Sequence, residues 1–294
     1  MSKKVSIILP VYNGAKCVAN SIDSVLSQTY ENFELVVVND CSTDNTLDIL
    51  NEYAKKDSRV KVFTNEVNKK LPRTLNAGFE KATGEYLTWT SDDNMYRPEA
   101  IAQMVQFLDE NPEVGLVYCD MTVRNELGDE IKEEERVAAP VKDLRLRSIC
   151  GACFMYRSEV AAKAGDYDPD LFLAEDYEYW IRISKNAKIA PLHKNLYIYR
   201  LQGQSLTGSL KWERIKAQKL KVINLHFDYL YSLCENEEDK ISFFNNYIKC
   251  CSKDDRKAGL AKVCALMPAY KKIARTNSIN DMKYRIKVFL HIEK

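Results

Sequence analysis

The sequence lacks a long hydrophobic run, a regular cysteine framework and an apparent leader. No apolar stretch approaches the roughly 20 residues needed to cross a bilayer. Residues 1–5 lead directly into an expected strand, without the apolar core and cleavage site of a signal peptide. The nine cysteines are odd in number and lack the even spacing of a secreted disulfide framework. These absences predict a protein of the reducing cytoplasm.

Several cofactor signatures are also missing. No GxGxxG follows the first expected strand and no GxxxxGK[ST] occurs, which excludes the usual phosphate turns of dinucleotide oxidoreductases and P-loop proteins. The three histidines show no metal-ligand spacing. Cys150 and Cys153 have metal or redox spacing, but a second pair is missing and strand periodicity places them on opposite faces. We therefore expect these cysteines and histidines to be structural or surface residues.

The net charge of +1 hides an uneven distribution of charged side chains. From Lys211 to the end there are 18 basic and 10 acidic residues, so residues 1–210 hold 25 basic and 32 acidic ones. A basic tail suggests an anionic neighbour, such as the inner face of the cell membrane or an acidic acceptor. A solvated helical face explains the same charges equally well. The composition, with 46% hydrophobic and 29% charged residues, is that of an ordinary globular protein.

The first hundred residues alternate between apolar strand patterns and helical patterns. Strands are expected at 5–9, 33–38, 60–64 and 86–90, and helices at 19–26, 46–54 and 73–82. This alternation predicts an α/β fold with a doubly wound, mostly parallel sheet. In such sheets ligands bind at the carboxyl ends of the strands, where the strand order reverses.

The second half is less regular. It predicts strands at 115–120 and 152–157, helices at 98–108, 158–164 and 177–185, and a charged hairpin or loop at 123–135. From residue 211 onward the pattern is helical, including an apolar face at 279–289. We expect a catalytic domain at 1–210, with a nucleotide-binding half at 1–97 and an acceptor half at 98–210, followed by a helical C-terminal extension at 211–294.

Two acidic motifs follow expected strands. Asp92 and Asp93 are costly to place side by side, because like charges repel and each carboxylate loses solvation. A divalent cation would relieve both costs and could bridge nucleotide phosphates, although a solvated turn also fits these residues. Asp40 ends another strand and could accept hydrogen bonds from a base or ribose. Asp44 favours a helix cap instead.

A third acidic motif opens the helix expected at 177–185. Glu175 and Asp176 could cap this helix and complement its dipole. They could equally lie in a sugar site, where a carboxylate within hydrogen-bonding distance of a hydroxyl acts as general base. Trp180 would then provide an apolar surface for the acceptor.

Eight segments, in this order and spacing, resemble the family 2 glycosyltransferases, whose nucleotide-binding fold is called GT-A. The segments are VSIILPVYN (5–13), SVLSQTY (24–30), FELVVVND (33–40), LNAG (75–78), ATGEY (82–86), SDDN (91–94), GACFMYR (151–157) and EDYEYW (175–180). Each is weak alone, but the ordered set is highly specific and spans roughly residues 4–208.

The resemblance implies an inverting transferase that moves a sugar from a nucleotide diphosphate donor, with UDP-sugars favoured, to a hydroxyl acceptor. Asp176 would be the catalytic base, and Asp92 and Asp93 would hold Mn²⁺ or Mg²⁺ in a DXD-like motif. The implied donor contacts are Pro10, Tyr12, Asn13, Asp40, Arg73, Asn76, Asp92 and Asp93. The implied acceptor-side residues are Gly151, Ala152, Glu175 and Trp180.

The expected acceptor is a glycan, glycolipid or glycoprotein, with bacterial surface polysaccharide synthesis as the implied setting and no nucleic-acid partner. The C-terminal helices could contact the membrane peripherally, bind the acceptor or form a homo-oligomer. Two alternatives are a nucleotide-sugar binding module without catalysis and a nucleotidyltransferase. Against the latter, residues 10–14 do not form its glycine-rich signature.

The sequence departs from the family pattern at three positions. Asn39 replaces the first acid of the pair after the second strand, and Thr90 stands where many members carry a further Asp. Gln202 stands where many have a histidine, which puts a third protein ligand for the metal in doubt. Arg200 and residues 204–207 are still expected to form a loop that closes over the donor.

Overall fold

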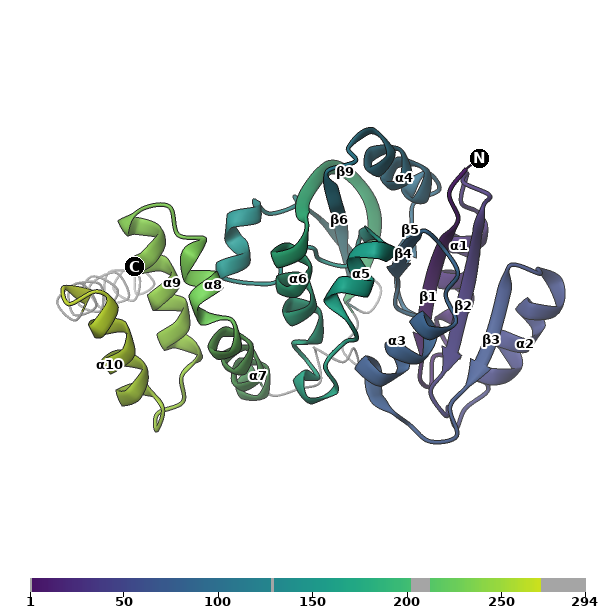
Figure 1. Ribbon diagram of the computed structural model, residues 1–294. Helices are drawn as coiled ribbons and strands as arrows, with labels where there is room; N and C mark the ends of the chain where they lie inside the picture. Colours follow the sequence, from purple (N-terminus) through teal and green to yellow (C-terminus); the bar gives the residue numbers. More distant parts are fainter. Residues whose placement is uncertain (1, 128–129, 202–211, 271–294) are drawn as a thin grey trace, which may run out of the picture. The chain divides into compact units, whose positions relative to one another are not determined.

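The computed structural model describes residues 2–127, 130–201 and 212–270. The chain divides into two compact units, residues 1–211 and residues 212–294 (Figure 1). The strands are β1 Val5–Val11, β2 Phe33–Asn39, β3 Val60–Thr64, β4 Tyr86–Trp89, β5 Met95–Tyr96, β6 Val114–Leu127, β7 Glu130–Arg136, β8 Phe154–Arg157 and β9 Lys188–Leu201. The helices of the first unit are α1 Val18–Leu26, α2 Thr46–Lys56, α3 Lys70–Glu80, α4 Ala100–Glu110, α5 Ser158–Ala164 and α6 Glu175–Asn186, with short 3₁₀ turns at Val141–Arg145 and Pro169–Leu171.

One mixed sheet organises the first unit. Its strand order is β3-β2-β1-β4-β8-β6-β9-β5, with β7 paired to β6. The pairs β3–β2, β2–β1, β1–β4 and β6–β9 are parallel, whereas β8 runs antiparallel to both β4 and β6. The chain builds β1, β2 and β3 in one direction and then returns to place β4 on the other side of β1. The predicted doubly wound α/β sheet is therefore confirmed, with its switch point between β1 and β4.

Helices cover both faces of this sheet. On β1, Ile7 and Leu9 join a core with residues of α1, α2 and α4. Ile8 points to the opposite face, where it contacts α3. Gly78 is the residue of α3 that makes this contact possible, because a Cβ there would come within 2.4 Å of Ile8 Cγ2. The buried runs of β1 and β2 thus reflect burial on both faces.

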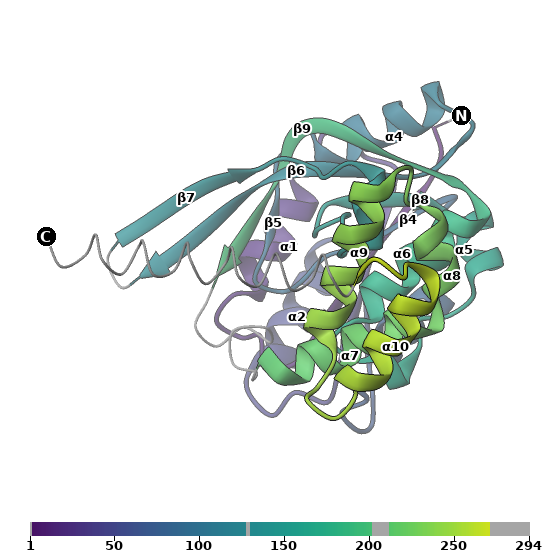
Figure 2. The ribbon, with the colours of Figure 1, turned by 90° about the vertical axis from the view of Figure 1, so that its left-hand side faces the viewer.

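Pairing over long sequence distances produces two strands that no local pattern predicted. β9 carries polar residues and a proline but pairs with β6 along most of its length, with register shifts. The two-residue strand β5 pairs with the far part of β9. The charged segment predicted at 123–135 as a hairpin or loop is a hairpin, in which β7 runs along the end of β6 (Figure 2).

The second unit is helical in its described part. It contains α7 Trp212–Leu225, α8 Phe227–Ser232, α9 Glu237–Cys250 and α10 Arg256–Leu266. Its core includes Val222, Leu230, Phe243 and Phe244, all fully buried. Among the described residues no helix is long and apolar enough to cross a membrane. The apolar face predicted at 279–289 lies outside the described residues.

The buried carboxylate of Glu34 on β2 is hydrogen-bonded to residues of the neighbouring strands β1 and β3 and of the loop before β4. Glu34 accepts hydrogen bonds from Ser6 Oγ at 2.7 Å, Thr83 N at 2.8 Å and Lys61 Nζ at 2.5 Å. Lys4 Nζ adds a fourth at 3.0 Å. Burial alone would raise the pKa of Glu34, but these hydrogen bonds outweigh it and hold the pKa well below its usual range.

We expect Glu34→Gln to lower the free energy of unfolding by about 2 kcal/mol at pH 7, because hydrogen bonds to a charged group are lost. A carboxylate whose folded-state pKa is depressed stabilises the fold above its unfolded-state pKa, and this contribution is lost on acidification. The difference between wild type and variant should therefore be largest above about pH 5 and shrink below about pH 4. Urea unfolding at several pH values measures it, and a pH-independent difference would contradict this assignment.

Candidate active site

The loops after β1 and β2 are tied together by short hydrogen bonds. Asn13 N donates to Ser42 Oγ at 3.0 Å, and Thr43 N donates to Asn13 Oδ1 at 2.8 Å. Asp44 stands one residue before Asn45, the N-cap residue of α2, and accepts from Thr46 N at 3.1 Å and from Ala15 N. The ends of the two parallel strands therefore form one continuous rim.

Asp92 and Asp93 follow β4 on the other side of the switch point. Gly14, in the loop after β1, lies directly against Asp92, since a Cβ there would come within 2.2 Å of Asp92 Oδ2. Burial and then the charge of Asp93 raise the pKa of Asp92 to about 7. Burial also raises the pKa of Asp93, although the charge of Arg200 partly opposes this. The acidic pair thus lies partly buried at the switch point.

The end of β9 encloses the acidic pair from the far side. Arg200 N donates to Asn94 Oδ1 at 2.9 Å, and the hydroxyls of Thr90 and Tyr197 are 2.6 Å apart. Thr90, where many family members carry an Asp, therefore fastens β4 to β9. Gln202 and the loop at 204–207 lie outside the described residues.

The two carboxylates suit a divalent cation that also takes substrate oxygens. Burial raises the pKa of both carboxyl groups, and the charge of Asp93 raises that of Asp92 further, so a bound cation would favour their charged forms. Within the described ranges no group of three or more His, Cys, Asp or Glu side chains could hold a metal ion. Mg²⁺ is commonly held by one or two carboxylates together with substrate phosphates, so the pair fits this mode.

Asp40, at the end of β2, fixes the start of α3. Its Oδ1 accepts from Asn65 Nδ2 and Lys69 N, both at 2.8 Å, and its Oδ2 accepts from Lys70 N at 3.0 Å. The N-cap residue of α3 is Lys69, whose side chain does not cap the helix. The carboxylate of Asp40 instead accepts the free backbone N–H groups at the start of α3. Asp40 is only 4% exposed. Its predicted contact with a donor base stays a prediction, beside this structural role.

The other predicted donor residues differ in how open they are. Tyr12 is 49% exposed beside the partly buried Pro10, so its ring is free to stack on a planar group. Arg73 is exposed on the first turn of α3. The side chain of Asn76 exchanges two hydrogen bonds of 2.9 Å with the backbone of Tyr167. Asn76 therefore connects α3 to the segment before α6.

Two carboxyl groups occupy the beginning of α6. Glu175 accepts from Leu173 N at 2.6 Å, while burial and the charge of Asp176 raise its pKa to about 8. Asp176 is partly exposed and accepts from Ser148 Oγ at 3.1 Å and Tyr177 N at 2.6 Å. Burial raises the pKa of Asp176 as well, but these donors favour its charged form. Ser148 and Tyr177 therefore hold the carboxylate of Asp176 in a fixed orientation at the start of α6.

Aromatic side chains join this helix to the end of β4. Trp89 Nε1 donates to the Tyr167 hydroxyl at 3.0 Å, and Tyr167 stacks on Tyr179 of α6 with ring centroids 3.9 Å apart. Tyr167 is also close enough to Asp176 for that charge to raise its pKa, after the larger effect of burial. The sheet end that carries the acidic pair and the helix that carries Asp176 therefore belong to one packed assembly.

The other predicted acceptor-side residues, Trp180, Gly151 and Ala152, differ in how exposed they are. Trp180, predicted to face the acceptor, is instead fully buried, with its ring centroid 4.5 Å from that of Phe154. Gly151 is exposed and has a φ of +60°, which favours glycine, and Ala152 is partly exposed. The adjacent Cys150 lies near enough to Asp176 for that charge to add to the effect of burial on its pKa. Residues 151–152 thus lie on the Asp176 side of the site.

Sequence reasoning did not identify some residues that build the site. Ser148 contacts Asp176 but carries no local signal, because it is 28 positions away in an irregular segment. Asn65 could have been found, because it follows β3 at the same sheet edge as Asp40. Cys150 and Cys153 are both buried free thiols, in line with their expected structural role.

Several solved structures share the fold of this chain. The chain is similar to Staphylococcus aureus TarS 1–349 in complex with UDP, with 20% identity, a TM-score of 0.59, and 93% of this chain and 92% of the other covered. It is also similar to the mannosyltransferase PcManGT of Pyrobaculum calidifontis in complex with GDP-Man and Mn²⁺, with 18% identity, a TM-score of 0.62 and 95% and 81% coverage. Against a longer TarS chain, half of that chain is covered. The fold is that of the GT-A glycosyltransferases.

Sequence relatives give the family. An uncharacterized glycosyltransferase of Haemophilus influenzae is 30% identical over 240 residues, which are 76% of this chain and 73% of the relative. One of Rickettsia typhi is 32% identical over 218 residues, which are 71% and 67% of the two chains. The model of glycosyl transferase family 2 matches residues 6–165, more than half of the chain. The chain belongs to glycosyl transferase family 2 and is a glycosyltransferase.

The contacts of Asp40 lead to a testable consequence. We expect Asp40→Asn to lower the free energy of unfolding by about 2 kcal/mol in the absence of any ligand, because an amide nitrogen would face a backbone N–H of α3. The matched control Asp254→Asn removes an exposed charge and should change it by less than about 0.5 kcal/mol. Urea unfolding measures both variants. If the two variants were equally stable, Asp40 would have no role in holding α3.

Proposed function

We propose that the protein is an inverting transferase that moves a sugar from a nucleotide diphosphate donor, a UDP-sugar in the first instance, to a hydroxyl of a glycan, glycolipid or glycoprotein. The observation that carries the proposal is that two acidic sites, one after β4 and one at the start of α6, are joined by the packed side chains of Trp89, Tyr167 and Tyr179. Asp92 and Asp93 lie at the switch point, and Asp176 lies at the start of α6 with a raised pKa.

The donor would lie across the rim formed by the loops after β1, β2 and β4. The exposed ring of Tyr12 can stack on the base, and Arg73 can approach the phosphates from the first turn of α3. The solved TarS complexes contain UDP and UDP-GlcNAc, and their similarity to this chain supports a uridine donor. Asn13 and Asp40 hold the loops that shape this surface.

Asp92 and Asp93 would hold Mn²⁺ or Mg²⁺. When bound, such an ion stabilises the negative charge that develops on the departing diphosphate. The PcManGT structure is a complex with GDP-Man and Mn²⁺, which supports this assignment. Arg200 supplies a fixed positive charge on the same side, because it lies close enough to affect the pKa of Asp93.

Asp176 would remove the proton from the acceptor hydroxyl. A raised pKa makes this carboxylate a better proton acceptor, and the hydrogen bond from Ser148 orients it and favours its charged form. The oxygen would attack the anomeric carbon from the face opposite the diphosphate, so the configuration would invert. Glu175, with a pKa near 8, would remain protonated and structural.

The two acids of α6 should respond differently to loss of charge. We expect Asp176→Asn to lower kcat by about 10³-fold, the usual contribution of a general base. Glu175→Gln should retain kcat within about fivefold, because Glu175 is already neutral at pH 7. In the wild type, the hydrogen bond from Ser148 lowers the pKa of Asp176. Ser148→Ala removes it, so the pKa should rise and the acidic limb of the pH–rate profile should move to higher pH. Equal losses in the Asn and Gln variants would reject Asp176 as the base.

The donor can be identified by nucleotide release. We expect the wild type with Mn²⁺ to release UDP from one sugar in a panel of nucleotide sugars, and Asp93→Ala to abolish release while the fold is retained by circular dichroism. Lys81→Ala, an exposed change away from the site, should behave as wild type. Failure of the wild type to bind any nucleotide with Mn²⁺ would reject the proposed function.

A further inference from the structure

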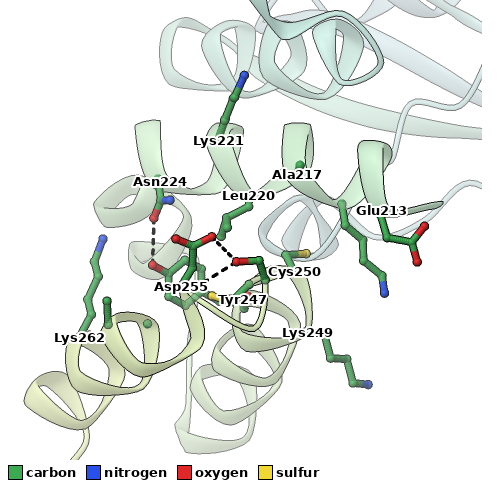
Figure 3. Close-up of a pocket in the computed structure, with 15 residues that line it drawn as sticks. Glu213, Ala217, Leu220, Lys221, Asn224, Tyr247, Lys249, Cys250, Asp255 and Lys262 are labelled. Atoms are coloured by element: carbon green, nitrogen blue, oxygen red, sulfur yellow. Dashed lines mark hydrogen bonds between the residues drawn. The ribbon is translucent and has the colours of Figure 1, made fainter. Parts of the chain in front are cut away.

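The helical unit contains a cavity of about 630 Å³ that the transferase chemistry does not use. It lies between α7 and α10, above the end of α9, and all of its lining residues belong to this unit. Figure 3 shows Leu220, Tyr247 and Cys250 near its centre, with lysines around its periphery. Its volume is within the usual range for a small-molecule site.

The cavity combines an apolar floor with a basic rim. Four lysines line it: Lys216, Lys221, Lys249 and Lys262. Against them stand two acids, Glu213 and Asp255, and Asp255 already accepts the Ser252 hydroxyl at 2.6 Å. Within the described part of the unit, none of the four lysines forms an ion pair with a carboxylate. An anionic group would therefore find uncompensated positive charge beside an apolar surface.

Exposed apolar side chains extend this basic rim. The large hydrophobic residues exposed in the described part of the unit are Trp212, Leu225 and Leu266, at 61%, 61% and 47% exposure. Each is four residues from a rim lysine, respectively Lys216, Lys221 and Lys262. On a helix, residues four apart are neighbours on one face. Trp212 also lies beneath the ammonium of Lys216, which is 5.9 Å from its ring centroid.

We infer that this cavity and its rim bind the phosphate-bearing head groups of anionic phospholipids and dock the unit on a membrane surface. Lysines bind the phosphates, and Trp212, Leu225 and Leu266 enter the interfacial region beside them. Tryptophan and leucine side chains exposed next to lysines are a combination that interfacial membrane binding uses. This inference does not depend on the proposed sugar transfer.

The alternative occupants differ in what they need. A soluble nucleotide or phosphate would use the lysines but would leave the three exposed apolar side chains without a role. An acidic partner helix would compete with Glu213 and Asp255 for the same lysines. An anionic lipid surface uses both the rim charge and the flanking apolar groups, and for this reason we commit to it.

Co-sedimentation of the full chain with vesicles tests the inference. We expect binding to vesicles of phosphatidylcholine with phosphatidylglycerol, and little binding to phosphatidylcholine alone. Lys216→Glu/Lys221→Glu/Lys249→Glu should weaken partitioning by roughly 100-fold, since each lysine near an anionic surface contributes roughly fivefold. Lys262 is left intact, because its ammonium lies 3.6 Å from the centroid of the buried Phe227 ring and its loss could disturb the fold.

A matched control separates the cavity from the general charge of the protein. Lys240→Glu/Lys253→Glu/Lys257→Glu changes the charge equally on residues of the same unit that do not line the cavity. This control should weaken partitioning by less than about threefold. Equal losses in both triple variants would overturn the inference, as would a wild type that stays in the supernatant with anionic vesicles.

A second readout tests the position of the rim. Trp212 fluorescence should be quenched by lipids brominated on their acyl chains, and Trp212→Phe should remove that quenching. The other two tryptophans belong to the other unit, where Trp180 is fully buried and Trp89 is partly buried. Inorganic phosphate should compete poorly with vesicles, since it offers no apolar contact. Full displacement by inorganic phosphate would instead show a soluble anion site and overturn the membrane assignment.

Discussion

The reversal of strand order between β1 and β4 is the constraint on which the candidate active site depends. Parallel strands end at the same edge of a sheet, so the loops after β1, β2 and β4 must converge there. Gly14 permits the closest of these approaches, because any larger residue would meet the carboxylate of Asp92. Both strands are buried on both faces, and their position therefore cannot shift without disrupting the core. The acidic pair is held by the packing of the whole sheet.

Unusual backbone conformations concentrate around this edge. The non-glycine residues with positive φ in the described ranges are Asn13, Cys41, Lys70 and Leu173. Asn13 and Cys41 lie in the loops after β1 and β2, Lys70 is the first residue of α3, and Leu173 lies two residues before Glu175 of α6. Such conformations cost about 1–3 kcal/mol each and persist only where the surroundings enforce them. Here the hydrogen bonds of Asn13, Asp40 and Glu175 enforce them, so precision at the site is obtained at the expense of stability.

The sequence predicted those parts of the structure that depend on local patterns. The apolar runs of β1 to β4 and the periodicity of α1 to α4 gave the doubly wound half, and the strand ends located the acidic pair. β9 could not be predicted, because Pro191, His193 and Lys194 interrupt any alternation and its pairing with β6 joins distant segments. Trp180 was assigned to a ligand surface because a helix start flanked by aromatic residues does not reveal which residue faces the core. The contact between Ser148 and Asp176 likewise exists only after folding.

The hairpin of β6 and β7 limits how copies of the protein can associate. In the described part of the sheet, β7 pairs only with β6, so its other side is an open edge of backbone donors and acceptors. Glu133, Glu134 and Glu135 are all exposed along it. If the β7 edges of two copies approached each other, their glutamates would lie face to face. The repulsion between these like charges protects the edge from pairing with another copy. Without these negative charges, the same edge would be open to sheet-to-sheet polymerisation.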